Sequence, residues 1–195
     1  MHIALIRHLP TEWNRKTWLQ GRRDIGISPV TDEDRKKIEE NQHILRKWEP
    51  FDFILASSLK RTRQTAEIYG YTPQCENLLD ELDFGQFEGK TKEQLMQAYP
   101  EQWVENPQDI VLGERVQNLE TRIERFLKKY KNGENLLIFG HGSWMRAIIS
   151  YYQFGHIHNM NKMIVENNDC VILPINQTFF EKRKGGYSFD KFHYL

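Results

Sequence analysis

Short apolar runs alternate with longer amphipathic stretches along most of the chain. Runs of four to six mostly apolar residues predict buried strands at residues 3–6, 51–56, 136–139 and 170–175. Helical periodicity and capping residues predict helices at residues 31–48, 57–69, 92–99, 114–130 and 143–152. This alternation predicts an α/β fold, a three-layer α/β/α sandwich in which helices cover both faces of a mostly parallel central sheet.

Particular residues set the boundaries of these helices. Thr31 or Asp32 is expected to cap the first helix and Pro50 to stop it, while Ser57 or Ser58 is expected to cap the second. The helix at residues 114–130 has the clearest pattern, because its apolar side chains form one stripe. The members of the stripe are Val116, Leu119, Ile123, Phe126, Leu127 and Tyr130.

The whole chain, residues 1–195, is predicted to form one domain, since this length supports a single core. The segment at about residues 84–113 differs from the rest because it is polar and is broken by Pro100 and Pro107. We expect it to be a cap-like insertion over a site. Near the end of the chain, a hairpin is predicted from residues 178–181 and 187–192, closed by a turn at residues 184–186.

Composition and charge exclude several classes of protein. The 27 basic residues balance 27 acidic ones, so neither nucleic acid nor an anionic membrane surface is an expected partner. No apolar stretch is long enough for a membrane span, and the first residues indicate a strand rather than a signal sequence. Cys75 and Cys170 lie far apart and form no metal or redox motif, which favours reduced thiols and a cytoplasmic location. The sequence leaves a homodimer open.

Two histidines follow directly from predicted strands. Arg7 and His8 end the first strand, and His141 follows the strand at residues 136–139, with a glycine on each side. In open α/β sheets the ligand binds beyond the carboxyl ends of the strands. We therefore expect a compact cationic site, which suits a phosphate group.

Four segments together resemble the histidine phosphatase superfamily, branch 1, the phosphoglycerate-mutase-like proteins. They are RHLPTEWN at residues 7–14, SSLKRTRQTA at 57–66, ELDFGQFEG at 81–89 and GHGS at 140–143. They occur in the order and approximate spacing of that family, and the resemblance spans roughly residues 3–150. It implies the three-layer fold of the family and phosphoryl transfer through a histidine.

The resemblance implies a role for each matching residue. His8 would be the nucleophile, since neutral imidazole attacks phosphorus and its phosphorylated form is labile. Arg7 and Arg61 would clamp the phosphate, because a guanidinium fork matches two phosphate oxygens. His141 would stabilise charge on the transferring oxygens, and Glu81 would protonate the leaving alkoxide.

Further positions are predicted to contact the phosphate or the substrate. They are Asn14 as an amide donor, Gln20 and Gly21 in a substrate loop, and Gly142, where the backbone can pass close to substrate. Three neighbours, Asp80, Asp83 and Glu88, remain alternatives to Glu81. No cofactor or metal is implied, because phosphohistidine chemistry needs none. His156 and His158, which with Asp169 could suggest a metal site, are expected to lie in an exposed loop instead.

The chain departs from the family immediately after His8. The family usually has glycine there, whereas this chain has Leu9 followed by Pro10. Leucine resists positive φ and Pro10 offers no N–H, so the turn can differ from that of the family. We expect the difference to bear on substrate preference rather than on the chemistry, because Thr11 and Asn14 keep their spacing.

The pattern favours hydrolysis of a small phosphorylated substrate. A phosphoglycerate mutase-type enzyme must hold a second phosphate, yet residues 84–113 contain just two basic residues, Lys90 and Lys92. Arg22 and Arg23 keep the mutase as an alternative, since they follow the predicted substrate loop. A catalytically silent phosphate-binding module is the second alternative, and the intact set of five predicted catalytic residues argues against it.

Overall fold

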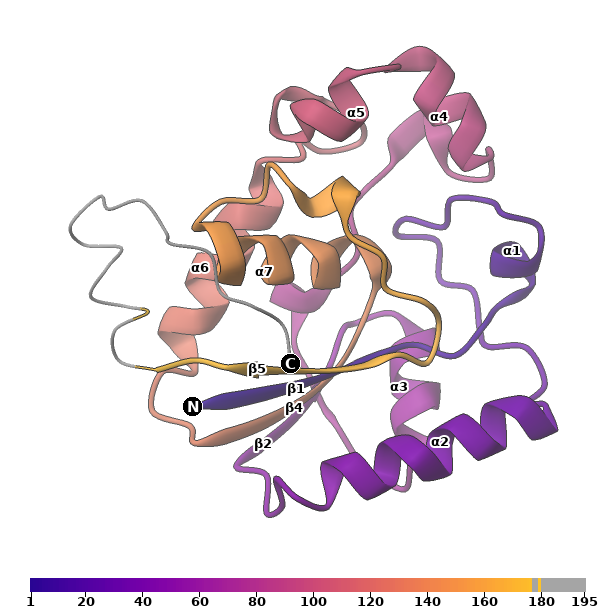
Figure 1. Ribbon diagram of the computed structural model, residues 1–195. Helices are drawn as coiled ribbons and strands as arrows, with labels where there is room; N and C mark the ends of the chain where they lie inside the picture. The colour runs from indigo at the N-terminus through magenta and orange to yellow at the C-terminus, as the bar shows by residue number, and fades with distance from the viewer. Residues whose placement is uncertain (177–178, 180–195) are drawn as a thin grey trace.

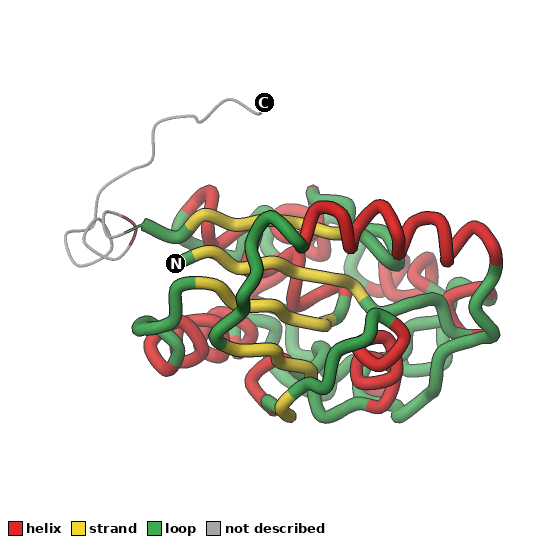
Figure 2. Tube along the Cα trace, turned by 90° about the horizontal axis from the view of Figure 1, so that it is seen from below, coloured by secondary structure: helices red, strands yellow, loops and turns green. Residues whose placement is uncertain are grey.

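A mixed five-stranded sheet lies at the centre of the computed structural model, which describes residues 1–176 and residue 179 (Figure 1). The strands are β1 (His2–Arg7), β2 (Phe53–Ala56), β3 (Gln74–Cys75), β4 (Asn135–Gly140) and β5 (Cys170–Pro174). Their order across the sheet is β3-β2-β4-β1-β5, and they lie side by side in Figure 2. All neighbours are parallel except β5, which runs antiparallel to β1 at one edge. The predicted mostly parallel sheet is confirmed.

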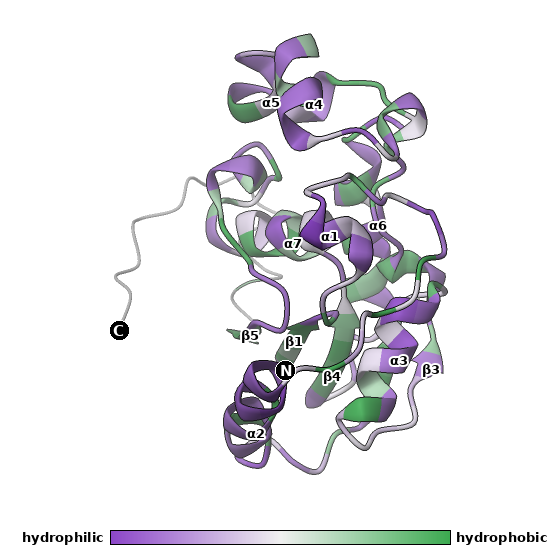
Figure 3. Ribbon diagram, turned by 90° about the vertical axis from the view of Figure 1, so that its right-hand side faces the viewer, coloured by the Kyte–Doolittle hydropathy of each residue, from purple (hydrophilic) through white to green (hydrophobic). Residues whose placement is uncertain are grey.

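Helices cover both faces of this sheet, as the sequence predicted. The α-helices are α1 (Glu12–Arg15), α2 (Asp32–Leu45), α3 (Lys60–Ile68), α4 (Lys92–Ala98), α5 (Gln102–Glu105), α6 (Asn118–Lys129) and α7 (Gly142–Phe154). Short 3₁₀ helices add η1 (Asn77–Leu79), η2 (Gly85–Phe87), η3 (Pro107–Asp109) and η4 (Met160–Lys162). Figure 3 shows the apolar strands β1 and β4 between α2 on one side and α7 on the other.

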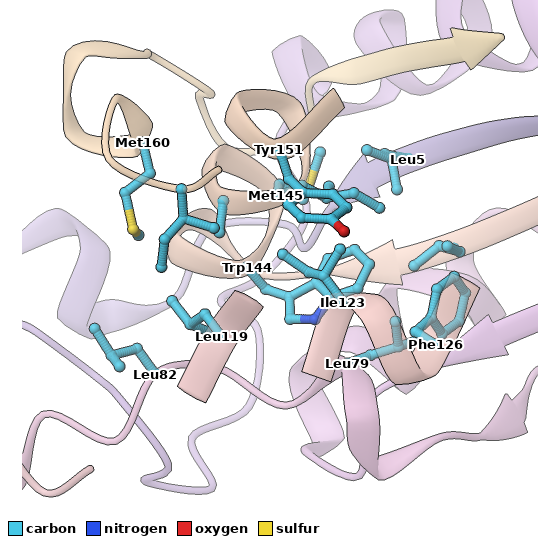
Figure 4. Close-up of a cluster of buried hydrophobic side chains, with 14 of the residues drawn as sticks. Leu5, Leu79, Leu82, Leu119, Ile123, Phe126, Trp144, Met145, Tyr151 and Met160 are labelled. Atoms are coloured by element: carbon cyan, nitrogen blue, oxygen red, sulfur yellow. The ribbon is translucent and has the colours of Figure 1, made fainter. Parts of the chain in front are cut away.

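Side chains of β1 alternate between two hydrophobic cores. Ile3 and Leu5 pack with α6 and α7, whereas Ala4 and Ile6 pack with α2 and α3. A strand covered on both faces has to be apolar at successive positions, which is why β1 and β4 are continuous apolar runs. The first core is centred on α6 and α7, where Trp144 contacts Phe126 edge-on at a ring-centroid distance of 5.6 Å (Figure 4).

The segment at residues 84–113, predicted to be a cap-like insertion, folds as η2, α4, α5 and η3. In Figure 1, α4 and α5 lie at the end of the molecule furthest from α2 and α3. Five of its apolar side chains are buried in the same core as α6 and α7: Phe84, Phe87, Leu95, Trp103 and Ile110. The segment therefore packs against the α6–α7 side of the protein instead of forming a separate core.

Several predicted boundaries were wrong by a few residues. Neither Ser57 nor Ser58 caps α3, which begins at Lys60 after Leu59, and the hydroxyl of Ser57 bonds other groups instead. The helix predicted from residue 114 starts at Asn118, because residues 111 and 115 first form a β-bridge. The predicted stripe on this helix is confirmed, since all six members are buried.

Other expectations at the sequence level had mixed outcomes. Thr31 caps α2, as predicted, in a capping box with Asp34. The short edge strand β3 was not predicted, because both of its residues are exposed and neither belongs to an apolar run. The predicted hairpin at residues 178–192 lies outside the described residues. Within the described part of the chain, no helix has the length and apolar character needed to span a membrane.

Replacing Phe126 by alanine should lower the free energy of unfolding by about 3–5 kcal/mol, because its fully buried ring would leave a cavity between α6 and α7. Urea unfolding followed by circular dichroism measures this loss. The matched control is Phe154→Ala at the end of α7, where the residue is 43% exposed and about 0.5 kcal/mol or less should be lost. Equal losses in the two variants would contradict the assignment of Phe126 to the core.

Candidate active site

The candidate site lies at the carboxyl ends of β1, β2 and β4. The parallel register pairs Arg7 with Gly140, so His8 and His141 emerge side by side from adjacent strands. Their ring centroids are 5.4 Å apart. Arg61 reaches the same place from the first turn of α3, which follows β2, and its Nε lies 3.2 Å from Nδ1 of His141. The structure therefore brings together four of the predicted site residues.

His8 is buried and has one ring nitrogen fixed by the backbone. Its Nδ1 lies 2.7 Å from the carbonyl oxygen of Leu9, and because a carbonyl only accepts, Nδ1 carries the proton. Its Nε2 has no hydrogen-bond partner within residues 1–176. Burial, followed by the charges of Arg61 and Arg7, lowers the pKa of His8 well below its ordinary value. The ring is therefore neutral, with a free lone pair on Nε2.

The Leu9-Pro10 segment after this histidine has a backbone conformation that does not require glycine. Neither residue has positive φ, and the Leu9 side chain is buried in the core with α2 and α3. The Leu9 N–H donates to Oγ1 of Thr65 at 2.9 Å, and the carbonyl oxygen of Pro10 accepts from the N–H of Ser28 at 2.8 Å. A glycine is therefore unnecessary at position 9 of this chain.

His141, the N-cap residue of α7, has protein partners on both ring nitrogens. Nδ1 accepts from Nε of Arg61, and Nε2 lies 2.6 Å from the hydroxyl oxygen of Ser57. Burial, then the charges of Arg61 and other nearby groups, lowers the pKa of His141 well below its usual value. His141 was expected to donate to an anion, but in this state it is neutral and its Nδ1 is an acceptor.

Arg61 is completely buried, yet two of its five N–H groups are unused. Besides the bond to His141, Nη1 donates to the carbonyl oxygen of Arg23 at 2.7 Å and Nη2 to that of Gly21 at 2.8 Å. One N–H therefore remains on each terminal nitrogen. Burial lowers the pKa of Arg61 to about 10, which leaves the guanidinium charged at neutral pH.

Arg7 and a third arginine, Arg146, flank Gly142. A Cβ at Gly142 would lie 3.3 Å from Cζ of Arg7 and 3.2 Å from Nη1 of Arg146. Arg7 Nη1 donates to the carbonyl oxygen of Val165 at 2.5 Å, whereas its buried Nε has no partner among the described residues. Burial lowers the pKa of Arg146 to about 10. Arg146 was not predicted from the sequence, although its position one turn into the helix after His141 was an available signal.

Glu81 lies at the amino end of α7. Its Oε2 accepts from the N–H of Ser143 at 3.1 Å, and its Oε1 accepts from the N–H groups of Trp144 at 3.2 Å and Leu82 at 3.0 Å. The buried carboxylate also interacts electrostatically with the guanidinium groups of Arg7, Arg61 and Arg146. Glu81 is thus the counter-charge of the arginine cluster.

The three alternatives to Glu81 have other partners. Asp80 accepts from the N–H and hydroxyl of Ser58, and Asp83 accepts from the N–H of Gly85. Glu88 binds residues 22 and 23 of the predicted substrate loop. Of the four carboxylates, Glu81 is therefore the one bonded to the start of α7, directly after His141.

The first N–H groups at the amino end of α3 already have hydrogen-bond partners. The N–H of Lys60 donates to Asp24 at 2.7 Å, and the N–H of Leu59 donates to the hydroxyl of Ser57 at 3.2 Å. Both N–H groups are therefore already hydrogen-bonded and are not available to bind an anion.

The predicted substrate loop closes over Arg61 and is tied to the cap-like segment. Gly21 has φ +51°, and a Cβ there would lie 2.1 Å from Oε1 of Glu88, so only glycine fits. Glu88 binds the N–H of Arg22 at 2.8 Å and Nε of Arg23 at 3.0 Å. Gln20 is buried, and its Oε1 has no partner in the described part of the chain.

Asn14 has a fixed side-chain orientation. Its Oδ1 accepts from the N–H and the hydroxyl of Thr11, both at 3.0 Å, in the capping box of α1. Its Nδ2 has no partner among residues 1–176, so the donor predicted to contact phosphate is not used within the described protein. Among the aromatic residues of these segments, the rings of Trp13 and Trp18 contact each other edge-on. The rings of Phe84 and Trp103 belong to the hydrophobic core.

No three histidine, cysteine, aspartate or glutamate side chains form a candidate metal site within the described residues. The rings of His156 and His158 lie 4.2 Å apart after α7. The chemistry that the site can support therefore has to be derived from imidazole, guanidinium and carboxylate groups.

Comparison with known proteins agrees with this arrangement. The sequence matches the family model "Histidine phosphatase superfamily (branch 1)" over residues 3–184. Phosphoserine phosphatase 1 of Hydrogenobacter thermophilus is 28% identical over 198 residues, covering 90% of this chain and 92% of that protein. The α-ribazole phosphatase from Shigella flexneri has a solved structure with a TM-score of 0.71 and 27% identity, covering 92% of this chain and 93% of that one.

A longer relative matches over part of its length. The 6-phosphofructo-2-kinase/fructose-2,6-bisphosphatase 4 of Homo sapiens is 31% identical over 160 residues, which are 77% of this chain. The chain spans 32% of the length of that relative. The family match over nearly the whole sequence and this relative together show that the chain belongs to branch 1 of the histidine phosphatase superfamily.

Proposed function

We propose that the protein is a phosphomonoester hydrolase that acts on small phosphorylated metabolites through a phosphohistidine at His8. The observation that carries this proposal is the geometry of His8. The Leu9 carbonyl oxygen holds Nδ1 as a donor and leaves Nε2 unpartnered next to the second histidine, and burial, followed by the charges of Arg61 and Arg7, lowers the pKa of the ring. A neutral imidazole is a nucleophile, and guanidinium forks bind phosphate through pairs of parallel hydrogen bonds. The names of two relatives, a phosphoserine phosphatase and an α-ribazole phosphatase, support the substrate class.

In the first step, Nε2 of His8 attacks phosphorus and the bond to the leaving oxygen breaks. Arg7 and Arg61 hold the phosphoryl oxygens. The bound phosphate replaces Glu81 as the counter-charge of these arginines, so that Glu81 takes up a proton in the complex and gives it to the leaving alkoxide. The attack places positive charge on the ring, and the Leu9 carbonyl oxygen stabilises it through the Nδ1–H bond. Substrate contacts are assigned to Asn14, Gln20, Gly21, His141 and Gly142.

In the second step, water attacks the phosphohistidine. The Glu81 carboxylate takes a proton from this water, which regenerates the acid, and inorganic phosphate leaves while His8 returns to its neutral form. No step requires a metal or an organic cofactor. A cytoplasmic location and a homodimer stay predictions from the sequence.

Arg22 and Arg23 each form a salt bridge with a carboxylate, and this favours hydrolysis over a mutase reaction. Arg23 is bound to Glu88, and Nη2 of Arg22 lies 3.4 Å from Glu114. These carboxylates neutralise the two cations that would have to hold a second phosphate. A silent phosphate-binding module would need no unprotonated nucleophile, so the state of His8 also favours an enzyme.

Incubation of the protein with p-nitrophenyl phosphate and a chelator should release phosphate at the same rate as without the chelator, since the reaction uses no metal.

Phosphoglycerate should likewise yield inorganic phosphate and no positional isomer, which chromatography of the products measures. Formation of the isomer would favour the mutase. Absence of turnover with every phosphomonoester tested would favour the binding module.

His8→Ala should abolish the covalent phosphoryl adduct, because it removes the nucleophilic Nε2. Acid-labile labelling by phosphorus-labelled substrate, trapped by rapid quenching in base, measures the adduct. The control is His43→Ala on the exposed surface of α2, which should label like the unmodified protein. Retained labelling of His8→Ala would refute the assignment of the nucleophile.

Glu81→Gln should slow hydrolysis of an alkyl phosphate such as glycerol phosphate by about 10²–10⁴-fold, because the poor leaving group needs a proton. Turnover of p-nitrophenyl phosphate should fall much less, since nitrophenolate leaves without protonation. Steady-state kinetics on the two substrates with the same enzyme sample give the ratio directly. Equal losses would remove Glu81 from the acid role.

A further inference from the structure

Ser57 is fully buried at the end of β2 and has three hydrogen-bond partners. Its hydroxyl oxygen lies 2.6 Å from Nε2 of His141, 2.9 Å from Oγ1 of Thr62 and 3.2 Å from the N–H of Leu59. A hydroxyl has one proton to donate and two lone pairs to accept with. The three partners therefore use its full capacity, and each proton can be assigned.

Thr62 fixes the direction of the Ser57 hydroxyl. Oγ1 of Thr62 donates its proton to the carbonyl oxygen of Leu59 at 2.8 Å. Because that proton is used, the hydrogen bond between the two hydroxyl groups must be donated by Ser57. Both lone pairs of Ser57 are then left to accept, one from the N–H of Leu59 and the other from His141.

The same reasoning assigns the tautomer of His141. Since Ser57 can only accept, Nε2 of His141 carries the proton. Nδ1 is then unprotonated, which agrees with the bond that it accepts from Nε of Arg61 at 3.2 Å. His8 has the opposite tautomer, with the proton on Nδ1. Different oxygen partners thus give the two histidines of the site opposite roles.

From this geometry we infer that Ser57 is a positioning residue that holds His141 as its Nε2–H tautomer. Nδ1 is then the ring nitrogen available to Arg61 in the free protein and to the phosphoryl group in the complex. A monoanionic phosphate supplies the proton shared with Nδ1, since Nδ1 itself carries none. The inference rests on the proposed function for its kinetic consequence, but the tautomer can be measured without turnover.

A hydrogen-bond partner behind a metal-binding histidine typically contributes about 10- to 100-fold to activity, and we expect a similar factor behind His141. Ser57→Ala should therefore lower kcat by this factor with little change in KM, because the binding arginines remain in place. In the free variant the Nε2–H has no acceptor, so part of the His141 population should give up the bond from Arg61 and move to the Nδ1–H tautomer. Ring-nitrogen NMR of the isotope-labelled protein, with and without inorganic phosphate, measures the tautomer directly.

Thr62→Val is a second variant that leaves the serine in place. It removes the acceptor of the Ser57 proton, so that the hydroxyl becomes free to donate to Nε2, and part of the His141 population should move to the Nδ1–H tautomer. The matched control is Ser58→Ala, which removes a neighbouring hydroxyl that binds Asp80 rather than His141. That control should keep both the tautomer and kcat. Circular dichroism and urea unfolding verify that each variant is folded.

The inference is overturned if His141 of the unmodified protein carries its proton on Nδ1. It is equally overturned if folded Ser57→Ala and Thr62→Val retain both the Nε2–H signature and full kcat. Failure of the proposed function gives a different result: the NMR signature and its response to Ser57→Ala persist, while no phosphomonoester is turned over.

Discussion

The hydrogen bond between Nδ1–H of His8 and the carbonyl oxygen of Leu9 decides which nitrogen of the proposed nucleophile faces the site. At 2.7 Å it fixes both the ring orientation and the tautomer, so that the lone pair lies on Nε2. The backbone of His8 is itself held on two sides, since its N–H donates to the carbonyl oxygen of Gly140 and its carbonyl oxygen accepts from Asn167. A one-residue change in the β1–β4 register would break this arrangement and separate the two histidines.

Burial of several guanidinium groups gives the site its affinity for an anion. Arg7, Arg61 and Arg146 donate mainly to carbonyl and other neutral groups, while Glu81 is a carboxylate that interacts electrostatically with all three. Removing cations from water is costly, so a phosphate that enters the site regains part of that cost. Burial, followed by the charges of Arg61 and Arg7, lowers the pKa of His8, which ties substrate binding to the state of the nucleophile.

Much of the fold could be predicted because local patterns determine it. Strands such as β1 and β4 are continuous apolar runs, and the stripe on α6 follows helical periodicity, so neither needed tertiary information. Ser57 was misassigned as a helix cap because a serine before a helix has that role by default. Its bond to His141 depends on the crossover that places β2 beside β4, which no local signal contains. The exposed strand β3 had no apolar pattern to find.

The main residues of the candidate site could also be predicted, because they lie in short sequence segments that can be recognised locally. Arg7, His8, Arg61, Glu81 and His141 lie in recognisable segments, and four of the five gather at the ends of neighbouring strands, with Glu81 bonded to the start of α7. Neutrality of His141 could not be predicted, since it depends on burial and on surrounding charges. The salt bridges of Arg22 and Arg23 could not be predicted either, because their carboxylate partners are remote in sequence.

The position of the phosphoryl group on the imidazole ring tests the account most directly. Because the Leu9 carbonyl oxygen keeps the proton on Nδ1, the phosphoryl group should be attached to Nε2 of His8. Phosphorus–proton correlation NMR of the quenched phosphoenzyme, followed by mapping of the labelled peptide, distinguishes the two nitrogens and identifies the residue. Attachment at Nε2 of His8 is the predicted result. Attachment at Nδ1 of His8, or at another residue, would contradict the account.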